Sequence, residues 1–173
     1  MNLRSILLLF LLAFIATSTN AQDKKSLNVI RAEKAPKIDG LLNDEIWQDA
    51  EIATDFIQFK PEIGSLRKKS QRTEVKITYD DKAIYIGAYL YDDPEKIMKQ
   101  LTSRDNSGQS DFFTVVLNPN NDSQNDTNFV VFSSGQQADA ISNPSIGEDF
   151  SWNAVWQSAV KILDNGWSVE IKI

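Results

Sequence analysis

The sequence predicts an all-β protein, a two-sheet antiparallel β-sandwich of immunoglobulin-like or jelly-roll-like architecture with one or two short helices. Three observations support this class. Apolar and polar residues alternate with a period of two in several short segments, as in strands that are buried on one face. The turn Asp164-Asn165-Gly166 separates two such segments and predicts a hairpin. Long polar connections join other segments, which is typical of strands that belong to two sheets.

The strands are predicted in order along the chain. Residues 74–79 alternate between polar and apolar side chains, which indicates a strand with one buried face. After a turn, the mostly apolar segment 83–91 is long and aromatic enough for a central position in its sheet. A polar connector at 118–128 joins the next two strands. The remaining expected strands are the pair 112–117 and 129–132 and the hairpin 155–163 and 167–173.

Two short helices are expected between these strands. Asn43 can cap a helical turn that runs through Trp47, with acidic residues near its positive end. Pro94 suits the first position of a second helix, in which Ile97 and Leu101 lie four residues apart on one face.

Three of the four tryptophans are predicted to be core residues. Trp47 lies on the apolar side of the first helix, and Trp156 and Trp167 alternate in phase with aliphatic residues of their strands. On the last strand, the face opposite Trp167 is predicted to be polar and consists of Ser168, Glu170 and Lys172.

Length and composition are those of one packed domain. The chain has 173 residues, of which 42% are apolar and 24% are charged. Its formal net charge of −6 argues against nucleic-acid binding, because that function needs a basic surface. Cysteine and histidine are both absent, which excludes disulfides, thiolate nucleophiles and a Ser–His–Asp triad. Any catalysis would therefore fall to carboxylates, lysine or tyrosine.

The N-terminus has the pattern of an export signal. Arg4 precedes an unbroken apolar run from Ile6 to Ala16, and Thr19 and Ala21 suit a cleavage site before Gln22. This run is shorter than the roughly 20 residues that span a bilayer, so we predict cleavage and no transmembrane segment in the mature chain. Export without cysteine indicates a bacterial envelope protein.

Trp152 differs from the other tryptophans because it lies in a predicted loop with acidic neighbours such as Asp149. An exposed indole beside a carboxylate suits a sugar, since the ring packs on the C–H face of a pyranose while polar groups bond its hydroxyls. A loop anchor at the sandwich edge fits equally well. Arg104 can donate to adjacent ligand hydroxyls or instead form a surface ion pair with Asp105 or Asp111.

Metal and hydrolase sites have weaker support in the sequence. Asp122 and Asp126 could bind Ca²⁺, but they lack the spaced-acid pattern and central glycine of a calcium loop. Neighbouring acids at 80–81, 92–93 and 148–149 suit turns rather than the two carboxylates, about 5–10 Å apart across a cleft, that a glycosidase needs.

Several motifs in order resemble family 9 carbohydrate-binding modules. The run 36–40 with Trp47 resembles the opening of that family, and segments 73–75, 79–80 and 84–85 resemble its next strand pair. Segment 166–170 is similar to its closing strand, and Arg104 and Asp111 fall where the family carries a polar, ligand-facing segment. Residues 148–156 resemble the signature of a subgroup found at the N-terminus of envelope proteins in which an outer-membrane β-barrel follows.

The resemblance implies a β-sandwich that binds a carbohydrate without catalysing a reaction, with structural calcium as in characterised members. It also implies that the chain is no enzyme and that any hydrolase activity would lie in an attached domain. The envelope subgroup implies a place in the periplasm or in association with the outer membrane. The candidate carbohydrate-binding residues are Arg104, Asp111, Asp149 and Trp152. The alternative is a docking or plug-like domain that serves a following β-barrel of the same protein.

The predicted domains are a signal peptide at 1–21, a lead-in at 22–34 and the sandwich at 35–173. Because Ile173 falls within an alternating strand, we expect the sandwich to continue beyond it.

Overall fold

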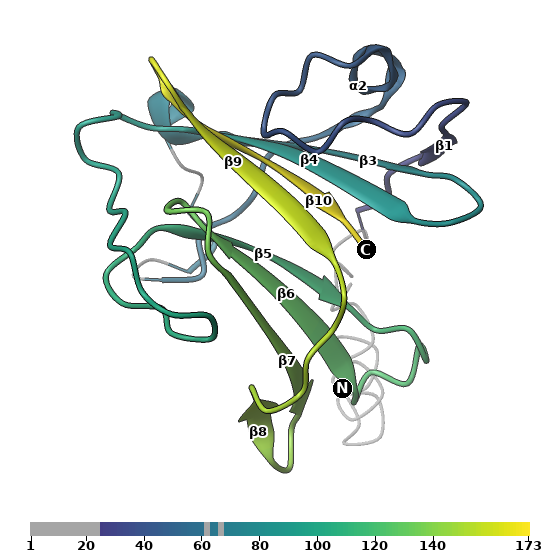
Figure 1. Ribbon diagram of the computed structural model, residues 1–173, viewed down its shortest axis with the longest axis vertical. Coiled ribbons are helices and arrows are strands. Elements are labelled where there is room, and N and C mark those ends of the chain that lie inside the picture. The colour runs from purple at the N-terminus through teal and green to yellow at the C-terminus, as the bar shows by residue number, and fades with distance from the viewer. Residues whose placement is uncertain (1–24, 61–62, 66–67) are drawn as a thin grey trace, which may run out of the picture.

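Two β-sheets that lie one over the other make up the protein (Figure 1). The computed structural model describes residues 25–60, 63–65 and 68–173. The larger sheet has six strands, in the order β1-β3-β4-β10-β9 with β2 paired to β3, and the smaller has four, in the order β5-β6-β7-β8. This architecture confirms the predicted β-sandwich. The predicted export signal lies outside the described residues.

The larger sheet is built around β4 and β10, which pair with each other along their length. The central position predicted for the segment 83–91 is confirmed, because β4 has β3 on one side and β10 on the other. The pairing of β1 with β3 is parallel, whereas the other pairs are antiparallel. The strands are β1 (Ile30–Arg31), β2 (Ile52–Ala53), β3 (Thr73–Tyr79), β4 (Ile84–Tyr91), β9 (Gln157–Leu163) and β10 (Gly166–Lys172).

The smaller sheet is an antiparallel meander that follows the chain order. Its first two strands are the predicted pair on either side of the polar connector. The strands are β5 (Phe112–Leu117), β6 (Asp126–Phe132), β7 (Gln137–Asn143) and β8 (Gly147–Asp149).

The hydrophobic core lies between the two sheets. From the larger sheet, Trp167, Val169 and Ile171 are at most 2% exposed and pack in one cluster with Phe129 and Val131 of β6. Trp156 belongs to the same cluster, whereas Trp47 of the first helix is buried on the other face of the larger sheet, where its ring packs against Gly87 of β4. The predicted core positions of these tryptophans are therefore confirmed.

The second face of β10 is buried as well, which the alternating pattern did not predict. Glu170 is fully buried, and one of its carboxylate oxygens accepts hydrogen bonds from the backbone N–H groups of Asp39 (2.9 Å) and Gly40 (2.8 Å). The other oxygen accepts from the indole N–H of Trp47 at 2.8 Å. Residues 32–50, which we call the N-terminal arm, thus cover this face of the sheet and supply its polar groups with partners.

The predicted helices are only partly present. The first is α2 (Glu45–Asp49), preceded by Asp44 rather than Asn43, and the Asp44 carboxylate accepts from the Lys37 N–H at 3.0 Å instead of capping the helix. A short 3-10 helix, η1 (Lys69–Gln71), was not predicted.

The second predicted helix is wrong. The backbone after Pro94 makes a turn and then pairs with residues 109–111, where Lys99 bridges to Ser110. Ile97 is buried, but Leu101 is 78% exposed, so the two residues do not share a packed helical face. Pairing between distant segments outweighs the local helical pattern here.

Candidate functional site

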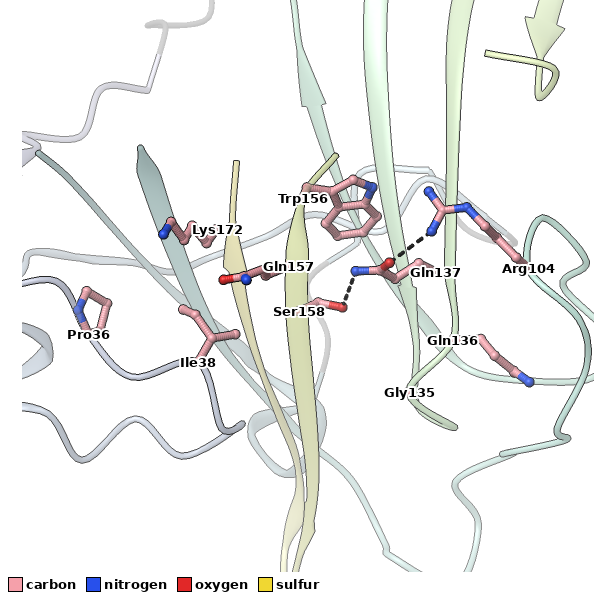
Figure 2. Close-up of a pocket in the computed structure, with 10 residues that line it drawn as sticks. All are labelled: Pro36, Ile38, Arg104, Gly135, Gln136, Gln137, Trp156, Gln157, Ser158 and Lys172. Atoms are coloured by element: carbon pink, nitrogen blue, oxygen red, sulfur yellow. Dashed lines mark hydrogen bonds between the residues drawn. The ribbon is translucent and has the colours of Figure 1, made fainter. Parts of the chain in front are cut away.

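Two hollows flank the smaller sheet and are the candidate sites. The first, which we call the polar cleft, has a volume of about 710 Å³ and lies where the edge strand β9 approaches β7 (Figure 2). Its lining comes from the N-terminal arm, the loop before β5, the β6–β7 turn and the ends of β9 and β10. The lining residues are Pro36, Ile38, Arg104, Gly135, Gln136, Gln137, Trp156, Gln157, Ser158 and Lys172.

Arg104 is held firmly at one side of the polar cleft. Its guanidinium donates to the Gln137 side chain at 3.0 Å and to the carboxylate of Asp139, which is fully buried. The same carboxylate accepts from the backbone N–H of Ala154, and Gln137 donates onward to Ser158 at 2.9 Å (Figure 2). Arg104 therefore ties its loop to β7, and Asp139 ties β7 to the segment before β9. Arg104, which the sequence analysis predicted as a hydrogen-bond donor to a ligand, thus stabilises the packing of its loop on β7.

The polar cleft offers little aromatic surface. Trp156 is its only aromatic lining residue, and the side chain is 8% exposed because it packs edge-on against Phe129, with ring centroids 5.3 Å apart. Polar groups can bond sugar hydroxyls here, but the cleft provides no open ring face on which a pyranose could stack.

The second hollow, which we call the aromatic groove, lies on the outer face of the smaller sheet and has a volume of about 410 Å³. Strands β5, β6 and β7 form its floor, and residues from β8 and from the loop before β5 form its sides. The lining residues are Asp105, Ser107, Phe112, Thr114, Val116, Asn128, Val130, Phe132, Ala138, Glu148 and Phe150.

Strand alternation explains why the groove exists. Along β5, the side chains of Phe113, Val115 and Leu117 pack into the core, so the intervening side chains of Phe112, Thr114 and Val116 face outwards. Cross-strand pairing carries this outward row over to β6, where Phe112 opposes Phe132, with ring centroids 6.2 Å apart. On β7 the row continues with Ala138, whose small side chain leaves the floor hollow.

The groove presents ring faces and polar groups together. Phe112 is 59% exposed and Phe150 is 40% exposed, so both offer apolar surface to a ligand. Asn128 is buried and donates to Ser142 at 3.2 Å and to Glu148 at 3.5 Å, which orients the exposed Glu148 carboxylate at the groove. No lysine or arginine of the described chain lines the groove. This combination suits a neutral ligand with an apolar face and several hydroxyl groups.

The four predicted site residues are not brought together in one site. Trp152 is partly buried and packs against Phe129 from the core side, with ring centroids 6.2 Å apart, which favours the loop-anchor alternative. Asp149 accepts from the N–H (2.9 Å) and hydroxyl (2.6 Å) of Ser151, and these bonds lower the pKa of its carboxyl group. Asp111 accepts from the N–H of Met98 at 3.1 Å. Both carboxylates support local backbone turns or pairs.

The groove residues that the sequence analysis missed are direct neighbours of those it named. Phe112 follows Asp111, and Glu148 and Phe150 flank Asp149. A signal was present, because the segment 112–117 is apolar on both faces although it belongs to a sheet with one core-facing side. Such a strand indicates either a second buried face or an exposed apolar surface.

The described residues contain no evident calcium site. They contain no group of three or more acidic side chains that could hold a metal ion. Asn118 donates one N–H to Asp122 (3.2 Å) and one to Asp126 (2.9 Å), and the Asp122 carboxylate also accepts from Gln124 and Asn125. The hydrogen bonds from Asn125, Gln124 and Asn118 lower the pKa of Asp122. Both carboxylates of the β5–β6 connector therefore accept hydrogen bonds from amide groups of the same segment.

Comparisons with known proteins are consistent with this architecture. A family model described as "Carbohydrate family 9 binding domain-like" matches residues 38–173. A family 9 carbohydrate-binding module from Caldicellulosiruptor kristjanssonii has a similar fold in its complexes with cellotriose (TM-score 0.59) and with glucose (TM-score 0.58), each at 21% identity. The similarity covers 84% of the present chain but only 66% and 67% of those chains. No curated protein matches the sequence significantly.

Proposed function

The chain belongs to the carbohydrate family 9 binding domain-like family, and we propose that it is a non-catalytic module that holds a neutral glycan in the aromatic groove. The observation that carries this proposal is the pair of exposed rings, Phe112 and Phe150, beside the carboxylate of Glu148. The similar protein from Caldicellulosiruptor kristjanssonii was solved with glucose and with cellotriose, which are neutral sugars.

Physical chemistry supports the aromatic groove over the polar cleft as the glycan site. A pyranose ring has an apolar C–H face and a rim of hydroxyls, so it needs an aromatic surface and directed polar groups in the same place. The groove supplies both, whereas the only aromatic side chain of the polar cleft is 8% exposed. A carboxylate on the rim and no cation in the lining disfavour acidic sugars, because like charges repel at short range.

Replacement of the groove aromatics tests the proposal. We expect Phe112→Ala and Phe150→Ala each to weaken binding of cellotriose by about tenfold, since the loss of one stacked ring costs about 1–1.5 kcal/mol. Binding is measured by isothermal titration calorimetry, with glucose, xylo-oligosaccharides and a broader glycan panel in parallel. The matched control is Phe59→Ala, because Phe59 is 75% exposed but lies outside the groove.

The outcomes distinguish a glycan site in the aromatic groove, a glycan site in the polar cleft and a docking function without a glycan. Loss of binding in both groove variants but not in Phe59→Ala supports the proposal. Loss only in Arg104→Lys or Gln157→Ala, with the groove variants unaffected, places the glycan in the polar cleft instead. If the unmodified protein binds no member of the panel, the glycan-binding proposal is wrong and the docking function takes its place.

We further propose that the protein is exported and serves an envelope protein in which a β-barrel follows this module. The pattern of residues 1–21 and the signature at 148–156 support this proposal. Within the described residues, no helix has the length and apolar character needed to cross a bilayer. Intact-mass analysis of the exported protein should show a chain that begins at Gln22, and retention of Met1 would contradict the cleavage.

A further inference from the structure

Asp139 of β7 is a fully buried acid that lines neither of the two hollows. Side chains alternate along a strand, and Ala138 lies on the floor of the aromatic groove, so the Asp139 carboxylate is directed to the opposite face of the sheet. A buried carboxylate is costly unless it is paired and hydrogen-bonded. The partners of Asp139 therefore indicate why an acid occupies this position.

One carboxylate oxygen of Asp139 holds the loop before β5. It accepts from the guanidinium of Arg104, which is its only cationic partner in the described chain. The next residue, Asp105, is attached to the same strand. Its N–H donates to the Gln137 carbonyl at 3.2 Å, and its carboxylate accepts from the Asp139 N–H at 3.3 Å. Asp105 and Ser107 line the groove, so these bonds fix one of its sides.

The backbone conformation of Asp105 is further evidence that this loop is held in place. Its φ of +62° lies in the left-handed region, which residues other than glycine seldom adopt, although aspartate tolerates it better than most. Such a conformation persists where the surrounding contacts determine it. The hydrogen bonds to Gln137 and Asp139 are such contacts.

The other carboxylate oxygen of Asp139 holds the segment after β8. It accepts from the backbone N–H of Ala154. At the start of this segment, Asp149 pairs with Ile141 of β7, so the stretch of chain that contains Phe150 is attached to β7 at both ends. The exposed ring of Phe150 lines the groove, so this second attachment fixes the position of its other side.

We propose that Asp139 is a positioning residue of the aromatic groove, which sets the separation of the two sides through Arg104 and Ala154 without touching a ligand. This inference rests on the proposed glycan function. A groove whose sides are fixed before binding loses less conformational entropy when a ligand enters. Because both sides depend on one carboxylate, a change at Asp139 should alter the affinity for a glycan that it never contacts.

Asp139→Asn tests this role with a side chain of nearly the same shape. The amide keeps one oxygen acceptor but presents an N–H group to either Arg104 or Ala154, so one side of the groove is released. We expect binding of cellotriose, measured by isothermal titration calorimetry, to weaken about tenfold.

The matched control is Glu170→Gln. Glu170 is also a fully buried carboxylate that accepts from three N–H groups, but its partners belong to the N-terminal arm on the larger sheet. The control variant should lose stability as well, whereas its affinity for cellotriose should change by less than about twofold, because the groove lies on the other sheet. An equal loss of affinity in the two variants would show a general effect of stability and would overturn the proposal.

A double-mutant cycle with Phe150→Ala separates positioning from a general loss of structure. If Asp139 acts through the position of the Phe150 ring, Asp139→Asn should weaken binding about tenfold in the natural background but only about threefold or less when the ring is absent. Losses of equal size in the two backgrounds would contradict a role of Asp139 in placing that ring.

Amide hydrogen exchange of the natural protein tests the attachment without any substitution. The N–H of Ala154 donates to Asp139, whereas the N–H of Val155 makes no hydrogen bond within the described chain. We expect Ala154 to exchange at least about a hundredfold more slowly than Val155. Equal exchange would overturn the proposal even if Asp139→Asn failed to fold.

The combined results distinguish this inference from the proposed glycan function. Unchanged cellotriose affinity in a folded Asp139→Asn variant would overturn the positioning role alone and leave the glycan function standing. Absence of glycan binding by the unmodified protein would overturn both.

Discussion

Glu170 is the residue that the sequence pattern described least well. Alternation along the last strand places this side chain on the polar face, yet it is fully buried and accepts hydrogen bonds from three N–H groups of the N-terminal arm. Burial raises the pKa of Glu170 above its ordinary value of 4.5, while the hydrogen bonds from Asp39, Trp47 and Gly40 lower it in part. Local pattern cannot reveal this, because the partners lie more than 120 residues away in the sequence.

Glu170→Gln should destabilise the fold and change its pH dependence. The new amide must direct an N–H towards backbone or indole donors, which costs about 1–3 kcal/mol. In the natural protein, the folded state holds the Glu170 proton more tightly than the unfolded state does. The contribution of Glu170 to the free energy of unfolding therefore falls as the pH rises from 4.5 through the folded-state pKa.

Urea unfolding at a series of pH values measures both effects. Because glutamine does not titrate, the deficit of the variant should grow as the pH is lowered from 7 to 4.5. Glu95→Gln serves as the control, since Glu95 is exposed and its side chain is not part of this network. A deficit that stays constant over this range would show that Glu170 does not titrate differently in the folded protein.

At the scale of elements, the strands followed from the sequence far better than the helices or the site did. Alternation and the turn at 164–166 predicted β3, β9 and β10, and mostly apolar segments predicted β4, β5 and the second half of β6, because these strands bury at least one apolar row. The helix predicted after Pro94 failed because pairing with residues 109–111 is non-local. The groove was missed for a similar reason, since its lining residues come from β5, β6, β7, β8, the residue that follows β8 and the loop before β5.

The contrast between Trp167 on a central strand and Trp152 on a loop predicts different stability costs. Trp167 is 2% exposed between β4 and β9, so Trp167→Ala should cost about 3–5 kcal/mol by leaving a large cavity. Trp152 is only partly buried and contacts Phe129 at its edge, so Trp152→Ala should cost about 1–2 kcal/mol. Thermal and urea unfolding of the two variants measure these two losses of stability. Equal costs would show that the loop is as much a part of the core as the strand.

For the molecule as a whole, two layers with different outer faces explain how structure and function are divided. The N-terminal arm covers the outer face of the larger sheet and satisfies its buried polar groups. The outer face of the smaller sheet keeps the exposed rings of Phe112 and Phe150. One layer therefore stabilises the domain, and the other leaves apolar surface accessible to a ligand.

The contact between the N-terminal arm and the last strand also has a consequence for folding during synthesis. Asp39 and Gly40 bond to Glu170 across 131 and 130 residues of chain, and Gly40 packs so closely on Val160 that an added Cβ would lie 2.7 Å from its backbone. The first part of the domain therefore cannot reach its final place until β9 and β10 have been synthesised. Because such long-range closure slows folding, we expect the N-terminal arm to stay undocked through most of the synthesis of the chain. Such a state would suit the proposed export, because a secretion channel threads unfolded polypeptide.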